Sequence, residues 1–181
     1  MTYRLPKTFI LLFVAFLAFH SNSYSAEWGP ASDSSGDWNV DANWVNPATF
    51  PNAIDAVADF TKFNIGSTRD IDVEITITLG TLLMGDSSGT SRYEFEEGAG
   101  GNLTFDVSSG NALLRQDEDS GSNRVKPPIL LMDNLQIINA SSSQTLGFYG
   151  PINNNGHDIF MGGNANIRCD NSNAVFSGTG D

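Results

Sequence analysis

Apolar residues in this sequence occur in short runs that are separated by clusters of glycine, asparagine, serine and aspartate. Glycine and asparagine tolerate positive φ angles, so these clusters are positions at which the chain can turn tightly. After the N-terminal apolar run, no stretch long enough for a helix shows helical periodicity. The pattern therefore predicts an all-β chain made of many short strands.

The clearest strand signal lies at residues 71–79, where apolar and polar residues alternate strictly. A period of two predicts one half-buried strand, with Ile75 among the residues that face the core. The polar stretch at residues 117–128 ends in two prolines and predicts a surface loop protruding from one coil. Further short strands are expected at residues 92–96, 102–107, 129–132, 135–138, 145–149, 158–161, 166–169 and 174–176.

Many short strands at fairly even spacing are typical of a sandwich, a barrel or a solenoid. The shortness of the strands and the Asn and Gly in the turns favour the solenoid. Residues 146–150, 159–162 and 175–178 also repeat a short apolar run followed by glycine. Stacked rungs of this kind bury a continuous apolar column. We therefore predict a right-handed parallel β-solenoid, and because residues 173–181 read as the middle of a rung, we expect a chain truncated at its C-terminus.

The first 25 residues have the three-part order of a secretory signal peptide. Arg4 and Lys7 precede an unbroken apolar run at residues 9–19, and small residues around Ser23 and Ser25 follow it. The run is too short to cross about 30 Å of hydrocarbon, which takes about 20 residues. We predict cleavage after Ser25 and a secreted or cell-surface location, with no membrane association after cleavage.

The charge of the chain restricts its partners. The 181 residues carry 21 acidic and nine basic side chains, for a formal net charge of −12, and the signal peptide contains two of the basic ones. This acidity argues against nucleic acid as a partner, because binding to phosphate backbones requires basic patches. The seven remaining basic residues are spread along the chain, which predicts a poor cradle for polyuronates.

Catalytic patterns are sparse. A Gly-x-Ser-x-Gly match at residues 85–89 precedes an expected strand, whereas a nucleophile elbow leads into a helix. His157 is expected in an exposed turn, and Cys169 is the only cysteine, so the two are too few for a zinc site. Chance pairs among 21 acidic residues carry no information. We predict a protein without catalytic activity.

Calcium is the one cofactor for which the sequence offers candidate ligands. Asp117, Asp119 and Asn123 place oxygen atoms at alternate positions, as hard cations prefer. The segment lacks the glycine at position six and the glutamate at position twelve of an EF-hand loop. A solvated turn is the favoured interpretation, and no other cofactor is expected.

All three tryptophans, Trp28, Trp38 and Trp44, lie close together near the predicted mature N-terminus. They could form a cap in which the indoles point into the apolar column. They could instead form a platform for sugar rings, in which case at least two would lie coplanar on an exposed face. The sequence favours the cap, so we divide the chain into a signal peptide (1–25), a Trp-rich cap (26–60) and a solenoid (61–181).

The cap segment carries a family resemblance. Trp28 is followed by Gly-x-Trp at 36–38, Asn-Trp at 43–44, Pro-Asn-Ala at 51–53 and Asp-x-Val-x-x-Phe at 55–60. After a signal peptide, this order resembles the start of secreted bacterial proteins with autotransporter-associated β-strand repeats, which are abundant in planctomycete- and verrucomicrobia-like bacteria. The resemblance implies a surface-displayed or secreted β-solenoid with no catalytic residues to carry over. Unlike those proteins, this chain shows no run of well-formed repeats.

Together these observations predict a secreted or cell-surface β-solenoid with a structural or adhesive role. The main alternative is an extracellular carbohydrate-binding module that uses Trp28, Trp38 and Trp44, and a third is a polysaccharide-degrading β-helix enzyme. The expected partners are extracellular-matrix or surface polysaccharides. Self-association through an open C-terminal end is also expected, because unpaired strand edges are templates for association.

Overall fold

The computed structural model describes residues 25–29, 34–86, 89, 91–170 and 176–177. This part of the chain is built from short strands, and its one helical element is a single 3-10 turn, η1 (Asp41–Asn43). The predicted signal peptide lies outside the described residues except for Ser25, which begins strand β1 (Ser25–Trp28). The all-β prediction is confirmed.

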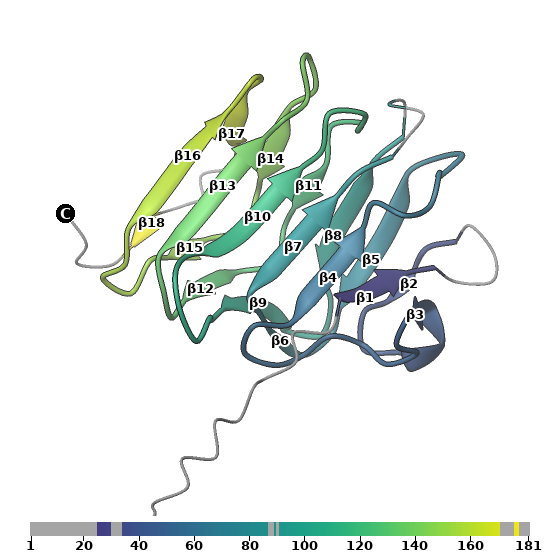
Figure 1. The fold of residues 1–181 in the computed structure, drawn as a ribbon, viewed down its shortest axis with the longest axis horizontal. Coiled ribbons are helices and arrows are strands. Elements are labelled where there is room, and N and C mark those ends of the chain that lie inside the picture. The colour runs from purple at the N-terminus through teal and green to yellow at the C-terminus, as the bar shows by residue number, and fades with distance from the viewer. Residues whose placement is uncertain (1–24, 30–33, 87–88, 90, 171–175, 178–181) are drawn as a thin grey trace, which may run out of the picture.

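The chain winds into a parallel β-solenoid of about five coils, and each coil contributes one strand to each of three sheets (Figure 1). The strands, coil by coil, are β4 (Val57–Phe60), β5 (Arg69–Val73) and β6 (Thr76–Leu79); β7 (Thr81–Met84), β8 (Tyr93–Glu97) and β9 (Asn102–Phe105); β10 (Ala112–Gln116), β11 (Arg124–Val125) and β12 (Ile129–Leu131); β13 (Leu135–Asn139), β14 (Leu146–Phe148) and β15 (Ile152–Asn153); and β16 (Ile159–Gly163), β17 (Ile167–Cys169) and β18 (Phe176–Ser177).

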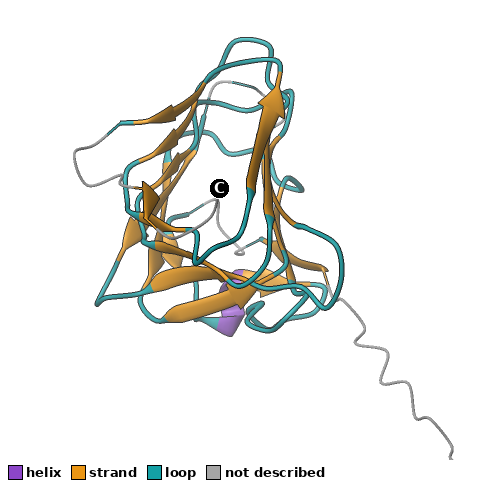
Figure 2. Ribbon diagram, turned by 90° about the vertical axis from the view of Figure 1, so that its left-hand side faces the viewer, coloured by secondary structure: helices purple, strands orange, loops and turns teal. Residues whose placement is uncertain are grey.

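The three sheets form the walls of a roughly triangular tube, as the view along the coil axis shows (Figure 2). Sheet A has the strand order β16-β13-β10-β7-β4-β1-β3, sheet B the order β17-β14-β11-β8-β5-β2, and sheet C the order β18-β15-β12-β9-β6. Strand β2 (Gly36–Asp37) pairs in parallel with β5, whereas β3 (Trp44–Val45) runs antiparallel to β1. The antiparallel β3 therefore closes the edge of sheet A at the N-terminal end. Because β4 already belongs to the first coil, the solenoid begins slightly before residue 61.

Successive coils pair in register, so residues one coil apart form columns. In sheet A, Ala58 pairs with Leu82, Leu82 with Leu114, Leu114 with Ile137, and Ile137 with Met161. The first four side chains are fully buried, whereas Met161 in the last coil is 48% exposed. Inward side chains between two coils are thus covered on both sides, as the solenoid prediction required, whereas Met161 in the last described coil is not.

The prediction of a single strand at residues 71–79 was wrong. The segment forms two strands, β5 and β6, which belong to different sheets, and Ile75 lies at the corner between them with 40% of its surface exposed. The inward residues keep the same parity on both sides of the corner. The alternation of apolar and polar residues therefore continues through the corner between β5 and β6, so it does not show where the first strand ends.

The expectation of a protruding loop at residues 117–128 was also wrong in part, because the segment contains β11 and two buried polar residues, Ser120 and Asn123. Asn123 Oδ1 accepts a hydrogen bond from Tyr93 N (2.8 Å), and its Nδ2 donates to Gln116 Oε1 (3.1 Å). Gln116 Nε2 in turn donates to Asn139 Oδ1 (3.0 Å). These hydrogen bonds satisfy amides that would otherwise be costly to bury, and they tie neighbouring coils together.

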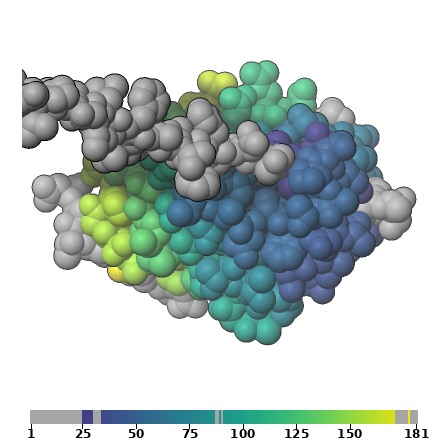
Figure 3. Space-filling view, turned by 60° about the horizontal axis from the view of Figure 1, so that its bottom comes forward, coloured from purple at the N-terminus to yellow at the C-terminus, as the bar shows by residue number. Residues whose placement is uncertain are grey.

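An aromatic cluster fills the N-terminal end of the tube, where the purple and blue residues gather in Figure 3. Phe60 lies at its centre, with ring centroids 5.3 Å from Trp28, 5.5 Å from Trp38 and 5.3 Å from Trp44. Trp38 Nε1 donates to the Pro51 carbonyl (3.1 Å), and Trp44 Nε1 donates to the Trp38 carbonyl (2.7 Å). The three indoles therefore close the apolar column, while the N–H groups of Trp38 and Trp44 donate to main-chain carbonyls.

We predict that Trp44→Ala lowers the free energy of unfolding by about 3–5 kcal/mol, the usual cost of deleting a large buried aromatic side chain. Trp44→Phe is the matched control. It keeps a ring against Phe60 and loses mainly the hydrogen bond to Trp38, so it should cost clearly less. Urea denaturation followed by far-UV circular dichroism measures both, and an unchanged midpoint for Trp44→Ala would contradict the cap.

Candidate functional site

The three tryptophans predicted as sugar contacts lie together, but inside the molecule. Trp28, Trp38 and Trp44 are 2%, 0% and 1% exposed. Trp28 and Trp44 meet edge to face, with an interplanar angle of 88°, so they are not coplanar. A sugar ring could not stack on these indoles unless the cap opened, which leaves the cap interpretation as the one that fits the geometry.

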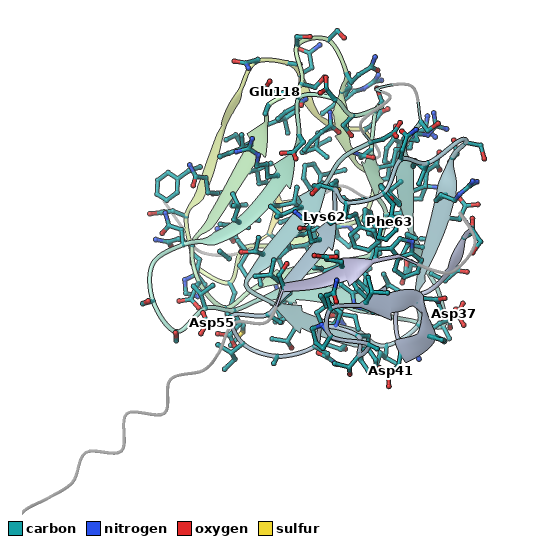
Figure 4. The ribbon with its side chains drawn as sticks, turned by 45° about the vertical axis from the view of Figure 1, so that its right-hand side comes forward. Asp37, Asp41, Asp55, Lys62, Phe63 and Glu118 are labelled. Carbon is teal, nitrogen blue, oxygen red and sulfur yellow. The ribbon has the colours of Figure 1, made fainter. Side chains whose placement is uncertain are left out.

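The three candidate calcium ligands are not brought together. Asp117 and Asp119 line a shallow groove at the corner after β10, whereas the side chain of Asn123 is fully buried and already bonded to Tyr93 and Gln116. Asp117 Oδ1 also accepts a hydrogen bond from Arg115 Nε at 2.7 Å. Glu118 lies beside this groove, across the molecule from Asp37 and Asp41 (Figure 4).

The other residues considered as candidates for catalysis or metal binding lie in turns and strands of the solenoid. In the Gly-x-Ser-x-Gly match, both serines lie outside the described residues, but Asp86 is buried and accepts hydrogen bonds from the N–H groups of Ile65 and Ser91. His157 closes a turn in which its N–H donates to the Asn154 carbonyl (2.8 Å). Cys169 is exposed, and partial desolvation by its surroundings raises the pKa of its thiol, which disfavours the reactive thiolate.

A feature that the sequence analysis missed is the outer face of sheet B. The register places Asp70, Glu94, Arg124, Gly147 and Arg168 in one column across five strands. Neighbouring positions in such a column are about 4.8 Å apart. Residues that are far apart in the sequence thus become direct neighbours on this face.

The basic residues gather on the same face. Five of the seven that follow the signal peptide lie in or directly beside strands of sheet B, and four of these, Arg92, Arg124, Lys126 and Arg168, face the same way as Glu94. These strands follow one another behind sheet A in Figure 1. The basic residues are spread along the sequence, but the coil length returns four of them to one wall of the tube.

Glu94 is the centre of an ion-pair network on this face. Its side chain is 9% exposed and is 2.5 Å from Arg92 Nη2, 3.3 Å from Arg124 Nη1 and 2.9 Å from Lys126 Nζ. Burial alone would raise the pKa of Glu94, but hydrogen bonds from Lys126 and Arg92 outweigh it and lower the pKa. Glu94 is thus ionised at neutral pH and holds three cations beside it.

The N-terminal half of the face is acidic. Asp72 lies in register between Asp37 and Glu96, and burial, followed by the charges of Asp37 and other nearby carboxylates, raises the pKa of Asp72. Asp70, Glu94 and Glu96 bring carboxylate oxygens within 4.8 Å of one another. However, Glu94 and Glu96 both pair with Lys126, so the arrangement is an ion-pair network.

Beyond Glu94 the face contains a hollow of about 180 Å³, which we call the sheet B groove. Its charged residues are both basic and stand beside one aromatic ring, a combination suited to a ring-shaped ligand that carries a carboxylate. The groove is lined by Ser122, Asn123, Arg124, Thr145, Gly147, Tyr149 and Arg168.

Comparisons with known proteins found no match: no family model fits the sequence, and neither a curated protein nor a solved structure resembles the chain significantly. The resemblance to proteins with autotransporter-associated β-strand repeats therefore stays a prediction. Among the residues that the structure describes, no helix is long and apolar enough to cross a membrane.

We predict that Glu94→Gln lowers the free energy of unfolding at pH 7 by about 1–2 kcal/mol, because it removes charge-assisted hydrogen bonds from a buried acceptor. A lowered pKa in the folded state contributes stability above the unfolded-state pKa, and this contribution is lost as the pH falls through the folded-state pKa. The difference between wild type and Glu94→Gln should therefore shrink below about pH 4. Urea titrations from pH 7 to pH 3 measure it, and a difference independent of pH would contradict the network.

Proposed function

We propose that this protein is a secreted or cell-surface β-solenoid with a structural or adhesive role and without catalytic activity. The order of a signal peptide, a Trp-rich cap and stacked coils supports the proposal. The same order supports a relationship to surface proteins with autotransporter-associated β-strand repeats. The cap segment resembles the start of those proteins, and that resemblance implies a secreted or surface-displayed solenoid.

The observation that carries the proposal is the stacking of the coils in register. It produces continuous outer walls on which side chains from successive coils stand side by side in rows, and the charged wall of sheet B is an example. Extended walls of this kind suit contact with a long polymer or a surface. The cap at the N-terminal end shields the apolar column, which suits a protein that must remain stable outside the cell.

Carbohydrate binding is the second candidate function, and one observation favours it. The sheet B groove combines a half-buried aromatic ring with hydroxyl and guanidinium groups, as sugar-binding surfaces require. The binding residues would then be Arg124, Tyr149 and Arg168, because the tryptophans are buried.

The test of the proposal is fractionation of the producing bacterium with an antibody to the folded solenoid, together with mass spectrometry of the N-terminus. We expect the protein in the medium or the surface fraction, beginning at Ala26. Residues 26–181, purified and mixed with the extracellular polysaccharide of the same cells, should sediment with it and release no new reducing ends or unsaturated sugars. A cytoplasmic protein, or one that degrades the polysaccharide, would overturn the proposal.

A further inference from the structure

We propose that the sheet B groove binds a carboxylated sugar unit of an extracellular glycan. In this assignment, Arg124 and Arg168 pair with the carboxylate, and Tyr149 stacks against the sugar ring. The inference rests on the proposed function, since it assumes an extracellular ligand, and it names the class of that ligand and the residues that contact it.

The position of the aromatic ring depends on Gly147. This residue faces outward between the buried Leu146 and Phe148, and a Cβ placed on it would be 2.8 Å from Cε2 of Tyr149. The Tyr149 ring therefore lies across Gly147, close to the sheet, where any side chain would displace it. The ring is half-buried and lines the groove, where its remaining exposed surface can contact a ligand.

Two guanidinium groups flank this ring. Arg124 and Arg168 are the register partners of Gly147 on either side, so their Cα atoms are about 10 Å apart. The Cζ atom of Arg124 is 5.6 Å from the centre of the Tyr149 ring, within the range of a cation–π contact. At this separation, the two long arginine side chains can converge from either side of Gly147 on one carboxylate between them.

Both arginines keep hydrogen-bonding capacity for a ligand. Arg124 shares the carboxylate of Glu94 with Arg92 and Lys126, and its contact, at 3.3 Å, is the longest of the three. Arg168 pairs with Asp170 (2.6 Å), but its side chain is 64% exposed. Because a guanidinium has five N–H donors in a planar fork, each arginine can also bind a carboxylate with two hydrogen bonds.

One edge of the groove, just before β11 and β14, is polar and held by hydrogen bonds. Ser122 Oγ donates to Gln144 Oε1 (2.9 Å) and accepts a hydrogen bond from Thr145 N (3.1 Å). These contacts join two consecutive coils at the edge of the groove. Ser122 and Thr145 thus present a preorganised edge to the hydroxyl groups of a sugar, which reduces the entropy cost of binding.

The charge around the groove and its volume restrict the class of glycan that it can bind. The chain has a net charge of −12, and the acidic half of sheet B, with Asp70, Asp72 and Glu96, continues the face on which the groove lies. A dense polyanion laid along this wall would be repelled. The volume of about 180 Å³ is below the roughly 300–1,000 Å³ of drug-sized pockets. We therefore infer a glycan in which carboxylated sugars alternate with neutral ones, bound one carboxylate at a time.

The test is isothermal titration calorimetry of residues 26–181 with four probes: a hyaluronan octasaccharide, its carboxyl-reduced form, an oligogalacturonate and cellohexaose. We expect binding of the hyaluronan octasaccharide, at least about tenfold weaker binding after carboxyl reduction, and weaker binding of the densely charged oligogalacturonate. Arg124→Gln should weaken binding about tenfold, and so should Gly147→Ala, whose methyl group pushes the Tyr149 ring out of place. Arg115→Gln, which removes an arginine from the sheet A side, is the matched control and should bind like the wild type.

The inference is overturned if none of the carboxylated probes binds, if carboxyl reduction leaves affinity unchanged, or if Arg124→Gln and Gly147→Ala bind like Arg115→Gln. Unfolding midpoints of each variant show that a loss of binding is not a loss of fold. If Arg124→Gln still sediments with the extracellular polysaccharide as well as wild type, the groove assignment fails while the surface role stands. If the groove binds the octasaccharide but the native protein is found in the cytoplasm, the surface role fails while the groove assignment stands.

Discussion

The in-register pairing of parallel strands from one coil to the next is the constraint on which the rest of this structure depends. Residues that are one coil apart in the sequence become neighbours in a column across the sheet, and each column faces either the core or the solvent. The inward column through Leu82, Leu114 and Ile137 is fully buried because each side chain is covered by its counterparts in adjacent coils. The same register on the outside places Glu94 beside Arg124 and so creates the charged wall of sheet B. Stability and surface chemistry therefore have a common origin in the backbone hydrogen bonds.

Much of this fold could be predicted from the sequence, because glycine and asparagine clusters mark where strands end and short apolar runs mark what they bury. The corners could not be predicted. Ile75 continues a perfect alternation and yet lies exposed where the chain passes from sheet B to sheet C, since alternation records the facing of residues and not the direction of the chain. The buried amides of Gln116, Asn123 and Asn139 were equally hidden. In a sequence, asparagine indicates a turn. Only the structure shows that the side-chain amides of these three residues form hydrogen bonds with one another.

The candidate binding residues were missed for a related reason. Tryptophan is a typical sugar-binding residue, which made the three tryptophans candidates. In the structure their rings instead pack around Phe60 and close the end of the apolar column. The groove is assembled from three coils, whose segments at residues 124–126, 147–149 and 168–170 each place outward residues two positions apart. Once the coil length is known, aligning these segments reveals the arginines on either side of the tyrosine. Without it, the basic residues look scattered in an acidic chain, and nothing in the sequence points to a site.

The most direct test of this register is disulfide formation between residues one coil apart, in a Cys169→Ser background. Leu113 and Gln136 are outward-facing register partners in β10 and β13, so their Cα atoms lie within the roughly 4.4–6.8 Å that a disulfide spans. Ile138 faces the same way but is two residues further along β13. The account predicts that the pair Leu113→Cys and Gln136→Cys oxidises readily to an intramolecular disulfide in the folded protein, and that the pair Leu113→Cys and Ile138→Cys does not. Efficient crosslinking of the second pair, or none in the first, would contradict the register and with it the columns that define both the core and the groove.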